Sequence, residues 1–289
     1  MREKIEYFFV KFLIAFLGFL PKSIIYKIMY CIAILFFKLE KRRSILTIKN
    51  FTLAFPEKSQ KEIHTLARKC YESLSVTLAE LIMLLNKKID INSLIKNKDE
   101  ALNTLHNLTK ERQDGVLFVT AHFSNWELLA QFLPLNGYKM LGIGRRGNNA
   151  LIEKNITTPF REQYGNTNIH KRNAILKIVK TLKQNGYVGL LIDQKAGKDE
   201  SVKASFFGHE ADTTTSVALL QLKYNPIIIP MFIAREKDGL YRIIIREINP
   251  LENPSIESLT QYYNDILEDV IKMYPEQWFW MHNRWRIAK

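Results

Sequence analysis

One stretch decides how this chain folds: VLFVTAHFSNWE, residues 116–127. Its first part, Val116–Thr120, is an apolar, β-branched run that predicts a buried strand. The chain then turns polar, and Trp126–Leu133 predicts the beginning of a helix. His122 therefore stands where a strand ends, which is the edge at which open α/β sheets hold their chemistry.

Strand-like and helix-like segments alternate from residue 115 onward. Alternation of this kind predicts an α/β fold with a mixed, mostly parallel sheet flanked by helices. Tyr241–Ile248 follows the turn residues Asp238 and Gly239, so we expect it to form an antiparallel hairpin with the strand before it. The other expected strands are Lys139–Ile143, Tyr187–Ile192 and Pro226–Ile233, and the expected helices are Ala150–Gln163, Arg172–Gln184 and Thr213–Lys223.

The chain before residue 115 has a helical pattern. Ile45–Phe55 predicts a short helix closed by Pro56, and Ser59–Leu85 predicts a long amphipathic helix. The apolar face of this long helix is expected to consist of Ile63, Leu66, Cys70, Leu74, Leu78, Leu81 and Leu85. We see no internal repeat or linker. The expected organisation is one catalytic domain, residues 41–289, behind membrane-anchoring or interfacial helices in residues 1–40.

The N-terminal forty residues contain two apolar runs, Ile5–Leu20 and Ile24–Phe37. Lys11 and Lys27 each interrupt one run, and a clean spanning helix needs roughly 18–20 apolar residues. Three arrangements remain open: a marginal span, a pair of interfacial helices with snorkelling lysines, or a buried hairpin of a soluble protein. Membrane attachment is the expectation because so many large apolar side chains would otherwise need covering. A cleavable signal is not expected, because basic residues crowd the end of the segment.

The charge balance limits the partners. Lys and Arg number 42 against 29 Asp and Glu, a net charge of +13. Such a surface attracts phosphates, anionic lipid or an acidic protein. Nucleic acid is not expected, since no basic groove-reading helix and no aromatic binding motif is present. The cysteines, Cys31 and Cys70, lie in apolar patterns and suggest neither a disulfide nor a metal ligand nor a nucleophile, which favours a reducing, cytosol-facing location.

His122 and Glu127 form the strongest candidate for chemistry. Five residues on one helix turn through about 500°, so the two side chains meet only if His122 precedes the helix and Glu127 lies in its first turn. Glu127 would then orient the imidazole and raise its basicity. The alternative is structural: Ser124 and Glu127 have capping-box spacing, and His122 would be an ordinary hydrogen-bonded histidine. No Gly-x-Ser-x-Gly elbow, Walker loop or zinc spacing occurs, so a histidine base would activate a substrate hydroxyl for direct attack on an activated acyl group.

Two further motifs follow expected strands. GIGRRG, residues 142–147, matches the dinucleotide-binding fingerprint, but it lies in mid-chain and no acidic residue follows at the expected distance. A plainer function for this turn is to present the guanidinium groups of Arg145 and Arg146 to a phosphate or an anionic intermediate; the structural alternative is a flexible turn with solvated arginines. Asp193 and Gln194 directly follow another strand, so they should face the same edge as His122, unless Asp193 only forms a turn.

The last third contributes two more segments. FFG, residues 206–208, and TTTS, residues 213–216, suggest an apolar wall and a hydroxyl-rich helix N-terminus able to hold an anion, with ordinary N-capping by Thr213 as the alternative. Residues 275–286, PEQWFWMHNRWR, are dense in aromatics and arginine. They would cover the active-site cleft, lie at the membrane interface, or simply dock by their tryptophans.

Taken in order, these motifs resemble the lipid A biosynthesis late acyltransferases, the lauroyl/myristoyl transferase family of Gram-negative bacteria. His122-x4-Glu127 looks like the family's H-x4-D/E signature. The likeness continues over nearly the whole chain in GIGR (142–145), PFR (159–161), LIDQ (191–194), FFG to TTT (206–215) and PEQWFWMHNRW (275–285). Family members commonly have Tyr-Arg-Pro where this chain has Gly144-Arg145-Arg146-Gly147, so Arg145 is the arginine carried over.

The resemblance implies an enzyme of the bacterial inner membrane, on its cytoplasmic face. It would transfer a fatty acyl chain from acyl carrier protein to the free hydroxyl of an acyl chain on a lipid A precursor. His122 would be the general base, with Glu127 stabilising the imidazolium. The substrate-binding residues would be Arg145, Arg161, Asp193 and Gln194.

No metal or redox cofactor is needed for this reaction. The alternatives are an acyltransferase acting on another glycolipid or on glycerophosphate, a dinucleotide-binding oxidoreductase using residues 142–147, and a non-catalytic membrane-docking protein. Chain length and the hydroxyl that is acylated depend on the depth of the pocket, which the sequence does not give.

Overall fold

The structure, a computed structural model, describes residues 1–145, 147–171 and 174–287. Its centre is a six-stranded sheet with strand order β3-β2-β4-β1-β7-β8. Neighbouring strands pair parallel except β8, which pairs antiparallel with β7. The expected α/β class and the hairpin after Asp238 are therefore confirmed. The strands are β1 Val116–Thr120, β2 Met140–Gly144, β3 Thr167–His170, β4 Tyr187–Leu191, β7 Ile227–Arg235 and β8 Tyr241–Ile245.

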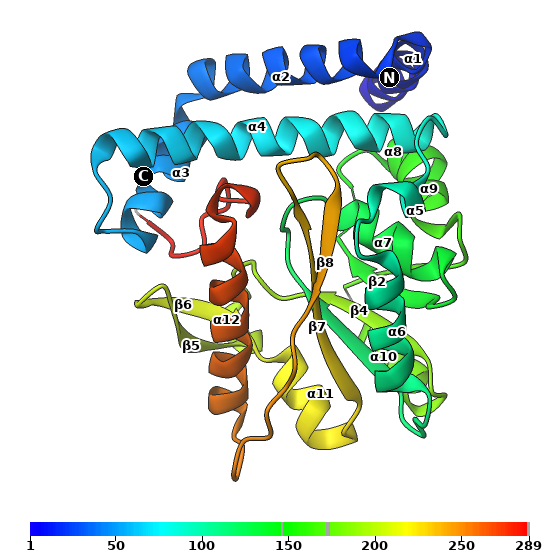
Figure 1. Cartoon of the computed structure of the whole chain (residues 1–289), viewed down its shortest axis with the longest axis vertical. Coiled ribbons are helices and arrows are strands. Elements are labelled where there is room, and N and C mark those ends of the chain that lie inside the picture. The colour runs from blue at the N-terminus through cyan, green and yellow to red at the C-terminus, as the bar shows by residue number, and fades with distance from the viewer. Residues whose placement is uncertain (146, 172–173, 288–289) are drawn as a thin grey trace.

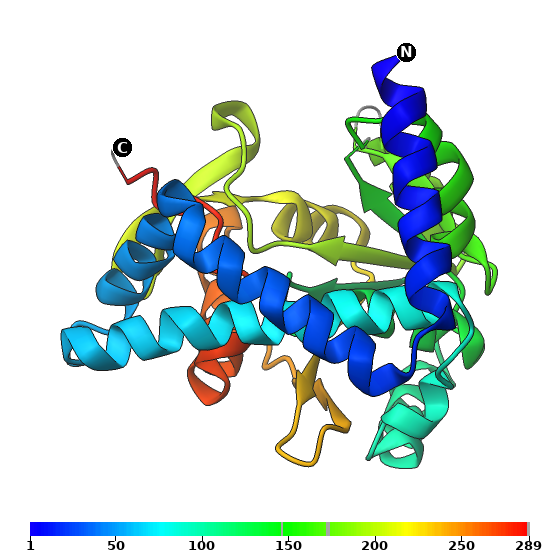
Figure 2. The same ribbon diagram turned by 90° about the horizontal axis from the view of Figure 1, so that it is seen from above.

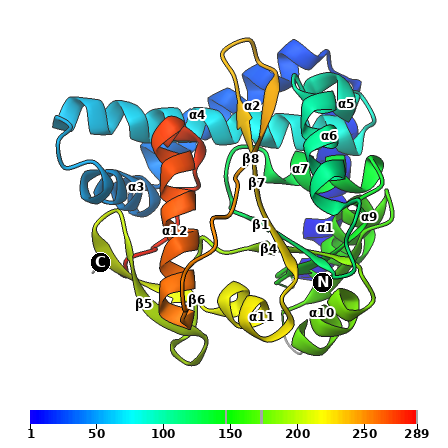
Figure 3. The same ribbon diagram turned by 60° about the horizontal axis from the view of Figure 1, so that its bottom comes forward.

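Helices cover both faces of this sheet, as Figures 1 and 3 show. On one face lie α5 (Ile91–Leu94), α6 (Lys98–Thr109) and α7 (Trp126–Leu135), and on the other lie α10 (Ala174–Lys183), α11 (Ser216–Tyr224) and α12 (Ile256–Met273). Because side chains alternate along a strand, β1 serves both cores. Val116 and Phe118 pack on the α7 side, whereas Leu117 and Val119 pack on the α10–α11 side.

Four helices precede the sheet: α1 (Arg2–Phe19), α2 (Lys22–Leu39), α3 (Lys41–Ala54) and α4 (Gln60–Leu85). The long helix α4 begins at a capping box formed by Ser59 and Glu62. Figure 2 shows α2 lying along α4 and α1 standing at an angle to both. The expected apolar face of α4 was partly wrong, because Leu78 is exposed while Glu80 is buried. The reason is that α4 packs between α2 on one side and the loop after β1 on the other, so polar positions are buried as well.

The N-terminal hairpin is only half covered. Ile25 and Met29 of α2 pack against Ala79 and Met83 of α4. The outer faces of α1 and α2 leave large apolar side chains exposed: Ile5, Phe8, Phe9, Phe12, Phe16, Phe19, Ile24, Ile32, Leu35, Phe36 and Leu39. Within the described ranges, no helix is both long and apolar enough to cross a bilayer.

Several segments differ from expectation. A hairpin of β5 (Ser201–Phe206) and β6 (His209–Thr214) occupies the region expected to be a wall and a helix N-terminus. Phe207 and Gly208 both have positive φ, as a tight two-residue hairpin turn requires. Thr213 is consequently paired in β6 and does not cap a helix, and α11 begins only at Ser216.

The remaining differences concern single short segments. The edge strand β3 was not expected, and the helix expected over residues 150–163 is α8 (Ala150–Ile152), a π-helical turn (Glu153–Thr157) and α9 (Thr158–Glu162). Residues 172–173 of the expected helix 172–184 lie outside the described residues. Short 3₁₀ turns cover Lys198–Glu200 and Pro275–Gln277.

Candidate active site

The loop between β1 and α7 holds His122 at the carboxyl end of the sheet. The capping box between Ser124 and Glu127, the structural alternative for this spacing, does not form. Ser124 has a left-handed backbone (φ 51°), its N–H donates to the carbonyl of Gln277 at 2.6 Å, and Asn125 is the N-cap. The Asn125 side-chain oxygen accepts from the N–H of Leu128 at 3.0 Å. Glu127 is thereby freed from a capping role.

A buried carboxylate on α4 fixes this loop from behind. Glu80 accepts hydrogen bonds from Asn125 Nδ2 at 2.7 Å, from the hydroxyl of Tyr241 at 2.5 Å and from the hydroxyl of Tyr26 at 3.1 Å. Burial raises the pKa of Glu80 above its usual value, although these hydrogen bonds act in the opposite direction. Residues from α2, α4 and β8 thus meet at the N-cap of α7, three positions after His122.

The imidazole of His122 is supported by Asp193, which follows β4. His122 Nδ1 lies 2.9 Å from Asp193 Oδ1, and Asp193 Oδ2 accepts from the indole N–H of Trp278 at 2.9 Å. Asp193 is only 1% exposed. Burial acts to raise the pKa of its carboxyl, but the His122 charge and the hydrogen bonds from His122 and Trp278 hold that pKa below its usual value. Asp193 therefore stays ionised behind the imidazole.

The pKa of His122 responds to the same contact. Burial alone would lower it, but the charge and hydrogen bond of Asp193, together with the charge of Glu127, raise the pKa above the usual 6.5. With Nδ1–H donated to Asp193, the neutral ring has Nε2 as its acceptor, and the Gln194 amide nitrogen lies 3.4 Å from it. The pair has the arrangement of a general base oriented by a buried carboxylate.

Glu127 contacts a different partner from the one that the spacing suggested. Both of its oxygens accept from Arg161 of α9, with Arg161 Nε at 3.2 Å and Nη2 closer still. The direct support of the imidazole that the sequence assigned to Glu127 comes instead from Asp193, because β4 lies beside β1 in the sheet. Glu127 acts on His122 at longer range through its charge. Its fork-to-fork pairing fixes the orientation of the Arg161 guanidinium.

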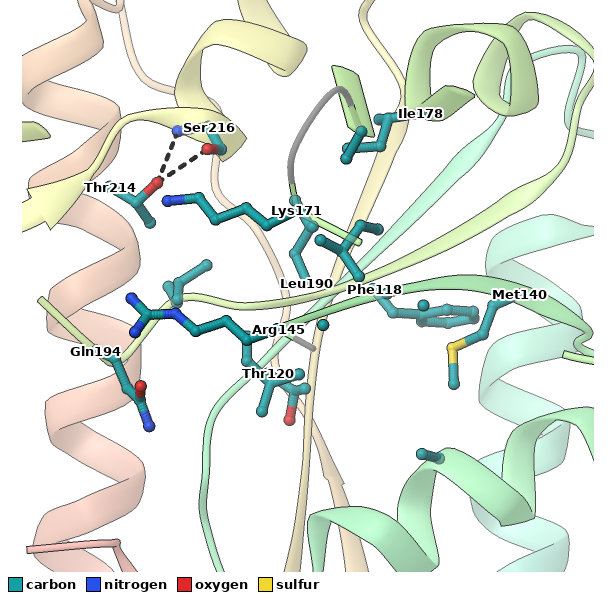
Figure 4. A pocket seen from close by; sticks show the side chains of 18 of the residues that line it. Phe118, Thr120, Met140, Arg145, Lys171, Ile178, Leu190, Gln194, Thr214 and Ser216 are labelled. Carbon is teal, nitrogen blue, oxygen red and sulfur yellow. Dashed lines mark hydrogen bonds between the residues drawn. The ribbon is translucent and has the colours of Figure 1, made fainter. Parts of the chain in front are cut away.

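A cavity of about 610 Å³ opens in front of His122. Of the residues expected at the site, it is lined by His122, Glu127, Arg145, Arg161 and Gln194, whereas Asp193 lies behind His122 and does not line it. Figure 4 shows Arg145 and Gln194 on one side of the cavity and Lys171, Thr214 and Ser216 above them. Arg146 lies outside the described residues.

The cavity is charged at its rim and apolar within. The charged lining residues are Arg145, Arg161, Lys171 and Lys195 together with Glu127, Asp199 and Glu200, and Arg161 pairs with Glu127 and Lys171 with Glu200. The apolar lining includes Phe118, Leu129, Leu133, Met140, Ile178, Leu190 and Leu220. Such a cavity fits an amphiphile with a long hydrocarbon part and a polar head that arginine and lysine can contact.

The C-terminal segment forms the base of the site. Trp278 bonds Asp193, and the N–H of Phe279 donates to the carbonyl of His122 at 3.0 Å. Arg284 is fully buried and donates to the carbonyl of Asp212 and to the hydroxyl of Thr213, each at 2.6 Å. Of the alternatives left open for residues 275–286, docking by tryptophans therefore describes the segment, because Trp278 and Trp280 are buried against the core.

The sequence did not reveal these supporting residues. Trp278 stood in a recognised motif, but nothing local indicated that its indole would reach Asp193. The only signal for Glu80 was a charged residue close to the apolar face of a long helix.

The fingerprint at residues 142–147 does not form a dinucleotide site. Gly142 and Gly144 lie within β2, whereas the fingerprint needs its glycines in the turn between strand and helix. Gly142 pairs with Gly189 of β4. The glycines thus serve the sheet, and the oxidoreductase alternative is not favoured.

The fold and the site together are those of an α/β protein in which a carboxylate-supported histidine faces a cavity with a charged rim and an apolar interior. Sequence comparison gives the family: the profile of the bacterial lipid A biosynthesis acyltransferases matches residues 1–287, and the chain belongs to this family. Among its relatives is the lipid A biosynthesis lauroyltransferase of Escherichia coli K12, 28% identical over 273 residues, which cover 92% of this chain and 87% of the relative.

Two further relatives bear related names. The lipid A biosynthesis palmitoleoyltransferase of Escherichia coli K12 is 28% identical over 255 residues, with 85% of this chain and 79% of the relative covered. A lipid A biosynthesis acyltransferase of Haemophilus influenzae is 26% identical over 255 residues, covering 86% and 79%. The chain is thus an acyltransferase of the lipid A biosynthesis family.

Proposed function

We propose that this protein transfers a fatty acyl chain from acyl carrier protein to a hydroxyl on an acyl chain of a lipid A precursor. The observation that carries the proposal is the His122–Asp193 pair at the mouth of an apolar cavity whose charged rim includes two arginines and two lysines. The relatives named as lauroyl- and palmitoleoyltransferases act on lipid A, which supports a fatty acyl donor and this class of acceptor.

The reaction needs one proton carrier. Neutral His122 takes the proton of the acceptor hydroxyl on Nε2 while the oxygen attacks the thioester carbonyl. The new C–O bond forms, the tetrahedral intermediate expels the thiolate, and the imidazolium returns its proton to the sulfur. Asp193 stabilises the imidazolium between these two steps.

The rim cations bind the charged part of the substrates. Arg161, oriented by Glu127, and Arg145 would contact a phosphate of the acceptor or the developing oxyanion. Gln194 lies within 3.4 Å of the His122 ring and lines the cavity, so its amide is placed to contact the bound hydroxyl or ester. Asp193, expected to bind substrate, is reassigned here to orienting His122.

Membrane attachment and the protein partner form part of this proposal. The exposed phenylalanines of α1, with the apolar outer face of α2, form a surface larger than scattered apolar residues on a soluble protein. Lying in the bilayer interface would cover it, with residues 1–40 as the anchoring part. The net charge of +13 favours anionic lipid and the acidic acyl carrier protein. We place the enzyme at the cytoplasmic face of the inner membrane, where acyl carrier protein would be available.

Purified protein, acyl carrier protein loaded with a fatty acid, and a lipid A precursor test the proposal. Mass spectrometry should find one additional acyl chain on the precursor, and His122→Ala should abolish its appearance while remaining folded. Transfer to glycerophosphate or another glycolipid but not to the precursor would replace the acceptor. Undiminished transfer by folded His122→Ala would remove the base.

A further inference from the structure

One part of the cavity is a groove on the α7 side of the sheet. Residues two apart on a strand share a face, so the strand register arranges the floor of this groove in rows. Phe118 of β1 pairs with Gly189 of β4, and Gly189 pairs with Gly142 of β2. One row across three strands therefore contains two adjacent glycines. Their missing side chains leave room that neighbouring side chains enter: a Cβ added at Gly142 would lie 2.7 Å from the side-chain oxygen of Asn168 of β3, which also lines the cavity.

The next row of the floor provides the side chain that lies across it. It contains Met140 of β2, paired with Tyr187 of β4. A Cβ added at Gly189 would lie 2.9 Å from the sulfur of Met140, so the methionine side chain reaches over the glycine. Figure 4 shows Met140 beside the ring of Phe118 at one end of the lining. Tyr187, stacked on Phe118 at 5.8 Å, lies beyond and does not line the cavity.

One face of α7 forms the roof. Trp126, Leu129, Ala130 and Leu133 line the cavity at the i, i+3, i+4, i+7 spacing of a single helix face. This side is enclosed: Phe118 is 2% and Leu129 3% exposed. The α10–α11 side of the same cavity is open.

The α10–α11 side has buried lining residues as well, Ile178, Leu190 and Leu220, but two of its lining residues are exposed. Ile175 of α10 is 55% exposed and Leu219 of α11 is 47% exposed, and both line the cavity. A linear hydrocarbon chain fits the enclosed side, because it would be desolvated along its whole length.

The depth of the groove follows from the geometry of its walls. Trp126, beside the His122 ring, and Leu133 are seven residues apart, which is about 10 Å along α7. The row that contains Thr120 and the row that contains Met140 are four residues apart along the strands, which is about 13 Å. With C–C bonds of about 1.5 Å, an extended chain advances roughly 1.25 Å per carbon. About 8–10 carbons therefore fit between the level of His122 and Met140.

We propose that this groove binds the acyl chain that is transferred, and that Met140, lying over Gly189, sets its length. The inference rests on the proposed function and extends it. With the carbonyl carbon at His122 added to these, the preferred donor has about 9–11 carbons. Methionine is flexible and unbranched, so neighbouring lengths are tolerated with reduced rates.

The test measures kcat/KM of the full-length enzyme with a series of saturated acyl carrier protein donors and one lipid A precursor. Met140→Ala should move the optimum to longer chains by about two carbons, changing the ratio of the two rates about tenfold. Gly189→Val places a side chain one row nearer His122, and should shift the optimum to shorter chains. The control is Leu141→Ala, the next residue of β2, which faces the other core, does not line the cavity and should keep the wild-type preference.

A second arm varies the acyl chain of the acceptor at a fixed donor. If Met140→Ala changes preference for the acceptor chain instead of the donor chain, the groove holds the acceptor and the inference is overturned. Unchanged donor preference in both folded variants overturns it as well. A wild-type enzyme that transfers no chain from any donor is a different result, because it refutes the proposed function and the inference together.

Discussion

The two sides of the His122 ring are built differently. Behind the ring, Asp193 and Trp278 are buried, and they come from the end of β4 and from the C-terminal segment. In front of the ring, Glu127 of the H-x4-E motif and Arg161 of α9 lie at the rim of an open cavity. The H-x4-E spacing therefore marks the site without specifying which carboxylate supports the imidazole. In the proposed reaction the buried side governs the proton transfer, and the rim contacts the substrate.

Apart from replacing His122 itself, removing the charge of Asp193 should reduce activity more than any other change at the site. Asp193→Asn keeps the shape but removes the charge that stabilises the imidazolium. We expect kcat/KM to fall about 10²–10⁴-fold, the range typical of positioned acid–base groups. Steady-state kinetics on folded protein measures this. A loss smaller than that of Glu127→Gln would reverse the roles of the two carboxylates.

Glu127→Gln should have the next largest effect. The variant weakens the pairing that orients Arg161 while leaving Asp193 on His122. Charged hydrogen bonds contribute about 1.5–3 kcal/mol, so we expect a fall in kcat/KM of about 10–100-fold. Arg161→Lys, which keeps the charge and loses the fork, is the matched variant and should show a similar loss. Full activity in both would leave the rim pair without a function in substrate binding.

The pH dependence of kcat/KM tests the contact between His122 and Asp193 directly. The base must be neutral, so activity should rise with pH along an acidic limb at the pKa of His122, above 6.5 in the wild type. Asp193→Asn removes the main contribution that raises this pKa while burial still lowers it, so the limb should move to lower pH. Log kcat/KM against pH for both proteins measures the shift. An unmoved limb would mean that another group titrates.

The free energy of unfolding should also depend on the His122–Asp193 pair. Because the folded pKa of His122 is raised, its contribution is full below the unfolded pKa of about 6.5 and is lost as pH rises through the folded pKa. Because the folded pKa of Asp193 is lowered, its contribution is lost as pH falls below about 3.8. The unfolding free energy of wild type minus that of Asp193→Asn should therefore be largest between these limits. Denaturant titrations at several pH values would detect it.

The smallest effect on catalysis is expected at Glu80, which supports the loop and not the ring. Glu80→Gln turns an amide N–H₂ toward donors that need an acceptor, costing about 1–3 kcal/mol of unfolding free energy. The kcat/KM of the folded fraction should change only a few-fold. Glu72→Gln, a partly exposed position on the same helix, is the control and should change stability by under about 0.5 kcal/mol.

Local pattern was sufficient for much of the fold. The strand Val116–Thr120 and the long helix capped by Ser59 follow from side-chain periodicity and capping chemistry, which act over a few residues. Where a longer-range contact competes, the local pattern failed. Thr213 looked like a helix cap but pairs with Val202 in a hairpin whose turn depends on Phe207 and Gly208.

By itself, the sequence determined that His122 stands at the end of a buried strand and that arginines and polar residues follow neighbouring strands. Only the tertiary structure decided that Asp193 supports the imidazole. The two residues are 71 positions apart, and they meet because β1 and β4 pair in register, Thr120 beside Leu191. It also decided that the glycines of β2 and β4 lie side by side under α7. Strand order and register are set by how the whole chain buries its apolar faces, and no short window of sequence contains that information.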